Sequence, residues 1–251
     1  MVYDCITFFN ELDLLEIRLN ILDPYVDYFV IGEGEETFSG IPKPFNFEEN
    51  QERFAKWSHK IKYLKIGKHE TDSAFERARY QKESIKSLLT LLNPKDDDIV
   101  YFGDLDEIWK PQEIKDDKVY NLEQLNYCYY LNQRSSERWV GTIVGKWKTI
   151  KENTFSHWRA THTNELPNGG YHFTNVGGAD QIRLKLNAYD HQEFNNEQIR
   201  ADIDRKIANG EDYVGRRTDW EGKPFEMWIS ELDLPKYILD NKTTWIKLFQ
   251  S

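Results

Sequence analysis

The stretch DDDIVYFGDLDEIWKP, residues 96–111, decides the fold because it joins a short apolar run to an abrupt polar end. Residues 99–102 (IVYF) are all β-formers and too few for a helix, so they predict a buried strand. The strand ends at Gly103, which we expect to let the backbone come close to a ligand. Asp104, Asp106 and Glu107 follow at once and place three carboxylates at the strand's carboxyl end.

The first 110 residues alternate strands with helices. Runs of β-formers predict the strands, and apolar residues at spacings of three and four predict the helices. The expected order is strand 2–9, helix 11–22, strand 26–31, strand 61–66, helix 75–92 and strand 99–102. This order is typical of an α/β fold with a mostly parallel central sheet and flanking helices. Ligands of such sheets bind beyond the carboxyl ends of the strands, where Asp104 and Asp106 lie.

Beyond Pro111 the pattern changes to short aromatic strands and two helices. We expect strands at 128–131, 139–144 and 171–176, a polar loop before the last strand, a helix from about 178 and a helix ending at Gly210. Leu184 also permits a strand in place of the first helix. We predict a main domain at 1–217 and a C-terminal extension at 218–251, aromatic from Trp220 onward. The extension is expected to pack on the domain; covering a ligand site or pairing two subunits in a homodimer are the alternatives.

Composition excludes several classes of function. The 251-residue chain has a formal net charge of -10, which disfavours nucleic acid as a partner. Its 14% aromatic content suits a surface that stacks on sugar rings and equally suits an ordinary core. Cys5 and Cys128 make neither a disulfide framework nor a zinc site. No window approaches about 18 uncharged apolar residues, so we expect a soluble cytoplasmic protein without an integral membrane segment.

The acidic turn after Phe102 has the chemistry of a divalent metal site. Asp104 and Asp106, one residue apart, can turn toward the same ion, and Mg²⁺ or Mn²⁺ prefers carboxylate oxygens shared with substrate phosphates. In the D-x-D of nucleotide-sugar transferases the metal bridges carboxylate and diphosphate and neutralises the departing charge. An acidic pair in a solvated turn is the alternative interpretation.

Four segments together resemble glycosyltransferase family 17, the family of the β-1,4-mannosyl-glycoprotein N-acetylglucosaminyltransferase that adds bisecting GlcNAc. They are YDCITFFNELDLLEIRLNIL, VDYFVIGEGEETFSGIPKP, DDIVYFGDLDEIWKP and GGYHFTNVGGADQIRLKLNAYDHQEFN, and the resemblance runs in order from about residue 2 to about residue 217. The resemblance implies a GT-A-type, Rossmann-like catalytic domain, a divalent metal, a UDP-sugar donor and inversion at the anomeric carbon.

The resemblance also implies roles for individual residues. Asp106 would be a direct metal ligand, and Asp104 would reach the ribose or the metal through water. Glu107 would orient its neighbours. The remaining residues expected near the nucleotide are Asn10, Glu11, Glu33, Lys43 and Arg79. For Arg79 an ion pair with Glu83 on a solvated helix face is the alternative.

His172 matches a histidine of the family and is the first candidate for a third metal ligand, with His191 as the rival. Inversion requires a base that takes the proton from the acceptor hydroxyl. Asp180, after a glycine pair at a helix start, is the candidate, and Glu193 is the second choice. Capping its helix is the alternative role for Asp180.

The sequence therefore predicts an inverting transferase that moves a sugar, GlcNAc in the first place, from UDP to a saccharide acceptor. Two other functions stay open. A non-catalytic glycan-binding module would bind sugar without metal-dependent binding of UDP, and a nucleotidyltransferase using the same metal would release pyrophosphate. The lack of a basic, glycine-rich phosphate loop disfavours the nucleotidyltransferase.

Overall fold

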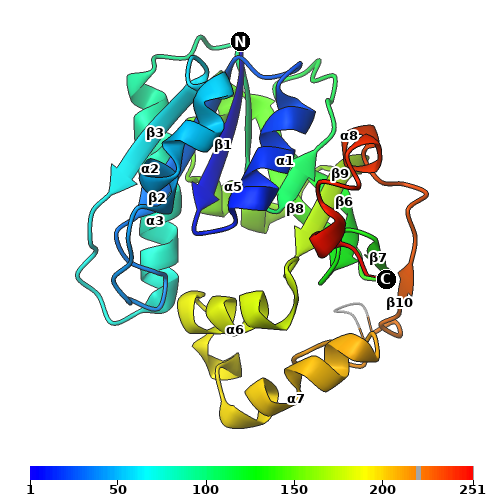
Figure 1. The fold of residues 1–251 in the computed structure, drawn as a ribbon. Helices are drawn as coiled ribbons and strands as arrows, with labels where there is room; N and C mark the ends of the chain where they lie inside the picture. The colour runs from blue at the N-terminus through cyan, green and yellow to red at the C-terminus, as the bar shows by residue number, and fades with distance from the viewer. Residues whose placement is uncertain (219–221, 251) are drawn as a thin grey trace.

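The computed structural model describes residues 1–218 and 222–250; Trp220, from which the extension was expected to be aromatic, lies outside the described residues. Within them, one ten-stranded sheet runs through the molecule with helices on both faces (Figure 1). Its strand order is β10-β7-β6-β8-β4-β1-β2-β3, with β9 beside β6 and β5 beside β9. The mixed α/β architecture, parallel at its core, confirms the predicted fold class.

The parallel part of the sheet comprises β1 (Val2–Phe8), β2 (Tyr28–Gly34), β3 (Ile61–Ile66) and β4 (Ile99–Asp104). β1 pairs with both β2 and β4, and β2 pairs with β3. The connections carry α1 (Leu12–Leu22), α2 (Asn46–Glu49), the 3₁₀ turn η1 (Gln51–Trp57) and α3 (Ala74–Leu91). All four strands therefore bring their carboxyl ends to one edge, where Asp104 is the last residue of β4.

The remaining strands are mostly antiparallel: β5 (Glu107–Trp109), β6 (Tyr120–Cys128), β7 (Gln133–Ser135), β8 (Trp139–Lys146), β9 (Glu165–Thr174) and β10 (Met227–Ile229). The predicted strand at 128–131 is wrong, because the chain turns there with Tyr129 at φ 68°. The strand in this region is β6, which ends just before the turn. It contains the buried polar residues Asn121, Gln124 and Asn126, so a search for apolar runs does not detect it.

Helices cover both faces of the sheet because side chains alternate along each strand. Ile6 and Phe8 of β1 join the core under α1 and α2, whereas Tyr3 and Cys5 join the core under α3. The short helices α4 (Trp147–Ile150) and α5 (Phe155–Thr161) also cover the α3 side. The helix α8 (Lys236–Asp240) and the 3₁₀ turn η3 (Ile246–Leu248) pack on the α1 side, to whose core Ile238 contributes.

Two further helices lie beyond the carboxyl ends of the parallel strands (Figure 1). They are α6 (Gly178–Ala188) and α7 (Glu197–Ala208), joined by the 3₁₀ turn η2 (Gln192–Phe194). Ile182 of α6 and Ile203 of α7 form a small core with Tyr129 and Tyr213. α6 and α7 therefore face the edge of the sheet at which the acidic turn lies.

Among the described residues, no helix is both long and apolar enough to cross a membrane.

Candidate active site

The acidic turn is fixed by the short strand that follows it. β5 pairs antiparallel with β9 and sets Glu107 opposite His172. The N–H of Phe173 donates to the carbonyl of Asp106 at 2.8 Å. This pairing, which no local sequence pattern indicates, brings the histidine of β9 to the aspartates after β4.

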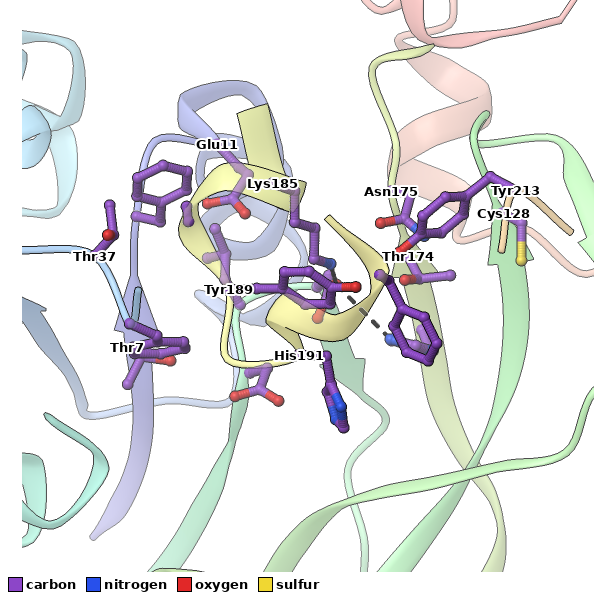
Figure 2. A pocket seen from close by; sticks show the side chains of 18 of the residues that line it. Thr7, Glu11, Thr37, Cys128, Thr174, Asn175, Lys185, Tyr189, His191 and Tyr213 are labelled. Carbon is purple, nitrogen blue, oxygen red and sulfur yellow. Dashed lines mark ion pairs between the residues drawn. The ribbon is translucent and has the colours of Figure 1, made fainter. Parts of the chain in front are cut away.

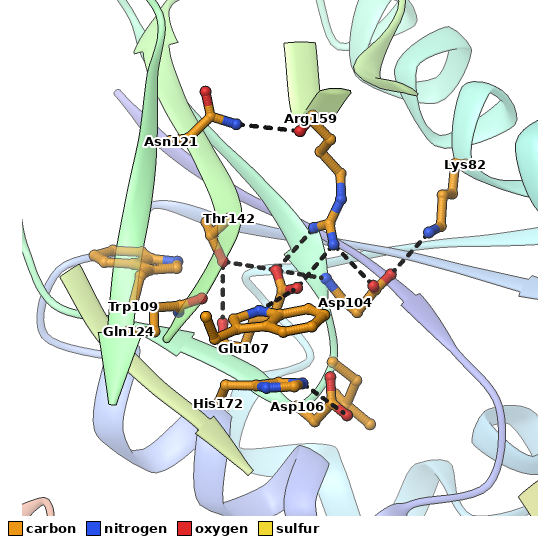
Figure 3. Close-up of polar contacts among 12 residues, drawn as sticks. Lys82, Asp104, Asp106, Glu107, Trp109, Asn121, Gln124, Thr142, Arg159 and His172 are labelled. Carbon is orange, nitrogen blue, oxygen red and sulfur yellow. Dashed lines mark hydrogen bonds and ion pairs between the residues drawn. The ribbon is translucent and has the colours of Figure 1, made fainter. Parts of the chain in front are cut away.

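Glu107 is the buried centre of a polar network (Figure 3). Arg159 of α5 donates to both of its carboxylate oxygens, each at 2.8 Å. The hydroxyl of Thr142 and the indole N–H of Trp139 donate at 3.0 and 3.1 Å. A Cβ on Gly103 would lie 2.6 Å from Glu107 Oε2. The space at Gly103 thus accommodates Glu107 and Thr142, which corrects the expectation that Gly103 admits a ligand.

Asp104 lies between two cations. Arg159 Nη2 is 3.0 Å from Asp104 Oδ2, and Lys82 Nζ of α3 is 3.3 Å from Oδ1. Burial opposes ionisation of Asp104, but Arg159 and Lys82 outweigh it and hold the pKa of that carboxyl well below its usual range. Asp104 is therefore an ionised carboxylate that is already neutralised by protein cations.

The backbone of the turn is held from beneath by Arg18 of α1, which is fully buried. Its guanidinium donates to the carbonyls of Leu105 and Glu107 at 3.1 and 2.7 Å. The same group forms a bidentate pair with Asp4 at 2.8 and 2.6 Å. All three nitrogens of the guanidinium thus donate to fixed partners, which leaves the turn little freedom, so the aspartates keep their orientation.

Asp106 and His172 face each other across 3.7 Å, measured from Oδ2 to Nε2 (Figure 3). The amide nitrogen of Asn126 donates to Glu137 at 3.2 Å, which turns its Oδ1 toward His172 Nδ1 at 2.9 Å. Nδ1 therefore carries the proton, and the lone pair of Nε2 points at Asp106. Burial lowers the pKa of His172 against the attraction of Asp106, which keeps the ring neutral.

Lys185 of α6 is the cation closest to Asp106, with Nζ 3.5 Å from Oδ2. Burial disfavours its charge, but Asp106 and then Glu11 outweigh burial and raise the pKa of Lys185. Glu11, at the end of the loop after β1, has its pKa raised by burial against the attraction of Lys185. Lys185 thus pairs with Asp106 and also feels the charge of Glu11, which comes from another part of the sheet edge.

The donor set fits one divalent ion at Asp106 and His172. Ligand bonds of about 2.1 Å allow two atoms of one ion to lie up to roughly 4.2 Å apart, and Asp106 and His172 lie closer than that. His172 offers a lone pair whose ring is oriented by Asn126, as metal-bound histidines require. Among the described residues, no group of three or more His, Cys, Asp or Glu could hold a metal by itself. An ion here would need further oxygens, from water or from a substrate, to complete its coordination.

A cavity of about 480 Å³ opens above the turn, of the size that small-molecule ligands occupy. Figure 2 shows its wall, to which β1, α6 and the segment around Tyr213 contribute. Asp104 and Asp106 line it together with the aromatic rings of Tyr189, Tyr213 and Phe194. The cavity therefore combines carboxylates and lysines with aromatic surface.

The structure brings together part of the predicted nucleotide-binding set. Glu11, Lys43 and Asp104 line the cavity. Glu33 does not, because it is buried beneath the loop after β2 and accepts from Lys43, Tyr63 and the first N–H groups of α2. Asn10 accepts from Gln181 of α6 and is not among the residues that line the cavity.

Arg79 is also corrected. It is exposed on α3 and does not line the cavity. The alternative pair with Glu83 is not formed either, because the carboxylate of Glu83 accepts from the N–H groups of Phe155 and Ser156 at the start of α5. Lys82, three residues further on, is the cation that α3 directs at the aspartates.

The two candidate bases lie outside the cavity lining. The side chain of Asp180 is 96% exposed and pairs with Arg183 on the outer face of α6. Asp180 does not cap α6 either, because Gly177 is the N-cap residue and no side chain makes a capping hydrogen bond there. Glu193 is exposed and paired with His191 at 2.7 Å. His191 lines the cavity, but its contacts are with Glu193, Phe75, Tyr189 and Phe194, whereas His172 is the histidine beside Asp106.

The residues that surround the aspartates were not among those expected from the sequence: Arg18, Lys82, Asn126, Arg159 and Lys185. One local signal was present. Thr154 caps α5 by accepting from the N–H of His157, a pattern that predicts a helix where a polar loop was expected. The other residues reach the site through pairing and packing that a single sequence does not reveal.

A sheet parallel at its core, with an acidic turn that opens into a cavity at the carboxyl edge, is consistent with a Rossmann-like glycosyltransferase fold. The family model of glycosyltransferase family 17 matches residues 1–249 of the 251, and the chain belongs to that family. The match includes the segment after residue 217. No curated protein matches the chain. Family membership supports glycosyltransferase activity.

Proposed function

We propose that this protein is a metal-dependent, inverting glycosyltransferase that moves a sugar, GlcNAc in the first place, from a UDP-sugar to a saccharide hydroxyl. The observation that carries the proposal is the pair of Asp106 and His172, 3.7 Å apart, at the edge of a ligand-sized cavity. A carboxylate oxygen and an oriented imidazole lone pair are suitable ligands for one divalent cation.

The charge balance of the site supports the need for that cation. Four carboxylates, Asp104, Asp106, Glu107 and Glu11, meet three cations, Lys82, Arg159 and Lys185, so the cluster has a net charge of -1. A nucleotide-sugar diphosphate would add about two negative charges. The side chains alone leave that charge uncompensated, and a divalent ion would offset it.

Each residue then has a defined task. Asp106 and His172 would hold the ion, which when bound would neutralise charge on the departing diphosphate. Asn126 keeps the proton of His172 on Nδ1, and Arg159 and Arg18 keep the turn in place. Lys43 and Glu11 line the β1 side of the cavity, where we place the nucleoside.

The acceptor side requires a base. Because Asp180 and Glu193 do not line the cavity, we propose Glu137 and Asp212 in their place. Both line the cavity, and both are held by Arg216, at 2.7 and 2.8 Å. A carboxylate oriented in this way can accept the proton of an acceptor hydroxyl.

Titration calorimetry with UDP-GlcNAc, with and without Mn²⁺, tests the proposal on the wild type and on Asp106→Ala. We expect metal-dependent donor binding by the wild type and its loss, together with loss of UDP release, in Asp106→Ala. Asp180→Ala, which removes an exposed carboxylate outside the cavity, is the matched control and should retain both. Equal donor binding with and without metal by the wild type would refute the mechanism.

The reaction products distinguish the proposed transferase from the two alternative functions. Sugar binding without metal-dependent binding of UDP would favour a glycan-binding module, and release of pyrophosphate would favour a nucleotidyltransferase. Transfer of sugar with release of UDP supports the proposal. Glu137→Gln and Asp212→Asn should retain donor binding, and the one that removes the base should lower the transfer rate by about 100-fold or more.

A further inference from the structure

Lys185 has more binding capacity than its contacts use. An ammonium group has three N–H donors, and among the described residues its ion pair is with Asp106 Oδ2, at 3.5 Å, longer than a good charge-assisted hydrogen bond. Its side chain is 30% exposed and lines the cavity. By contrast, Arg159 directs three short contacts at Glu107 and Asp104 and has no comparable freedom.

The backbone of Lys185 is fixed although its side chain is loosely held. Ile182 and Leu186 on either side of it in α6 are buried in the core shared with α7. Gln181, one turn earlier, donates to Asn10 at 2.9 Å and ties α6 to the end of β1. The four-carbon stem of a lysine can therefore swing over the cavity while its Cα stays in place.

Lys185 also competes for the ligand atom that the proposed ion would use. Its Nζ lies near Asp106 Oδ2, the same oxygen that faces His172 Nε2. A divalent ion at that oxygen would repel an ammonium group at this distance. After Asp106, Glu11 is the carboxylate that acts most strongly on Lys185, and it lines the same cavity.

We propose that Lys185 changes its partner when the site is filled, an inference that rests on the proposed function. Without a bound ion, Lys185 neutralises Asp106. Once an ion occupies Asp106, Lys185 binds the diphosphate of the nucleotide. The residue is thereby a diphosphate-binding group that also keeps the empty site from accumulating uncompensated negative charge. Its two roles act in opposite directions on the two ligands, because it opposes the metal and favours the nucleotide.

Calorimetry on the full chain tests this with three probes: Mn²⁺ alone, UDP in the presence of Mn²⁺, and uridine. For Lys185→Met we expect Mn²⁺ alone to bind as tightly as to the wild type or several-fold more tightly, because the competing cation is gone. UDP should bind about 10- to 100-fold more weakly, the effect of losing one charged hydrogen bond. Uridine, which has no phosphate, should bind equally to both proteins.

Two further variants complete the test. Lys185→Arg keeps the charge and should retain most of the UDP affinity. Arg183→Met removes a cation two residues away whose partners are Asp180 and Asp204, and it should leave all three affinities unchanged. Weaker binding of Mn²⁺ together with UDP in Lys185→Met would indicate a merely structural role and overturn the proposal.

Failure of this proposal can be told apart from failure of the proposed function. Metal-dependent UDP binding by the wild type that persists unchanged in Lys185→Met would overturn the role of Lys185 alone. Absence of metal-dependent UDP binding in the wild type would overturn both.

Discussion

Replacing Arg159 by Met tests whether the network around Glu107 holds the acidic turn in place. The substitution keeps much of the apolar stem and removes the guanidinium, which makes two contacts of 2.8 Å to Glu107 and one of 3.0 Å to Asp104. Glu107 is fully buried, so its charge would lose its partner without gaining water. The fold around the turn should be destabilised.

The magnitude follows from the contacts that remain. Removing one partner of a buried ion pair costs about 3–5 kcal/mol. Glu107 would keep the hydroxyl of Thr142, the indole N–H of Trp139 and the backbone N–H of Asp104 at 3.2 Å, so we expect a loss of about 3 kcal/mol. Glu107→Gln removes the charge instead, so Arg159→Met in that background should cost only about 1 kcal/mol.

Urea unfolding followed by circular dichroism measures all four proteins of this double-mutant cycle. We expect a coupling free energy of about 2 kcal/mol between the two positions and no change in the urea dependence of unfolding. A loss below about 1 kcal/mol for Arg159→Met, or the same loss with and without Glu107→Gln, would show that the pair does not stabilise the turn.

Two further perturbations test the electrostatics of the site. The pKa of Glu11 is higher in the folded than in the unfolded protein, so ionisation of Glu11 opposes folding. The stability that the protonated form contributes is present below about pH 4 and is lost as the pH rises through the folded-state pKa. Glu11→Gln should therefore be more stable than the wild type at pH 7 and equal to it near pH 4 by thermal unfolding; a pH-independent difference would contradict this. Asn126→Leu removes the acceptor of His172 Nδ1 and should weaken Mn²⁺ binding by about 10- to 100-fold with the fold intact. Unchanged Mn²⁺ affinity would mean that Asn126 does not orient His172.

The sequence could predict the elements whose signals are local. Strands β1, β3 and β4 and helices α1 and α3 combine apolar runs or helical spacing with clear breakers, and the structure places them within a residue or two of expectation. The acidic turn was found in the same way, because its position after a buried strand is itself a local pattern. His172 was placed through the family resemblance, and the structure puts it beside Asp106.

The groups that act on the turn could not be predicted, because they arrive by long-range contacts. Arg159 is 52 residues from Glu107, and Arg18 is 89 residues from it. Both are basic residues in polar or amphipathic surroundings, where solvent exposure is the ordinary expectation. Strand β6 shows the same difficulty, because Asn126 is buried on account of its partners His172 and Glu137. Burial of a polar residue depends on its partners, and those are fixed only by the tertiary fold.

Helix α6 shows where a better inference was available from the sequence itself. Asp180 was chosen for its position at the start of the helix, whereas the face of the helix decides which side chains reach the cavity. Gln181 and Lys185 are four residues apart and so about 40° apart around the axis, on the side that meets Asn10 and Asp106. Asp180 is about 140° from Lys185 and points to solvent. The stripe of Ile182 and Leu186 marks the buried side, and Lys185 borders it. α6 thus presents a cation to the aspartates and no carboxylate that lines the cavity. The two carboxylates proposed to accept the acceptor's proton, Glu137 and Asp212, come from other segments of the chain, and Arg216 holds both.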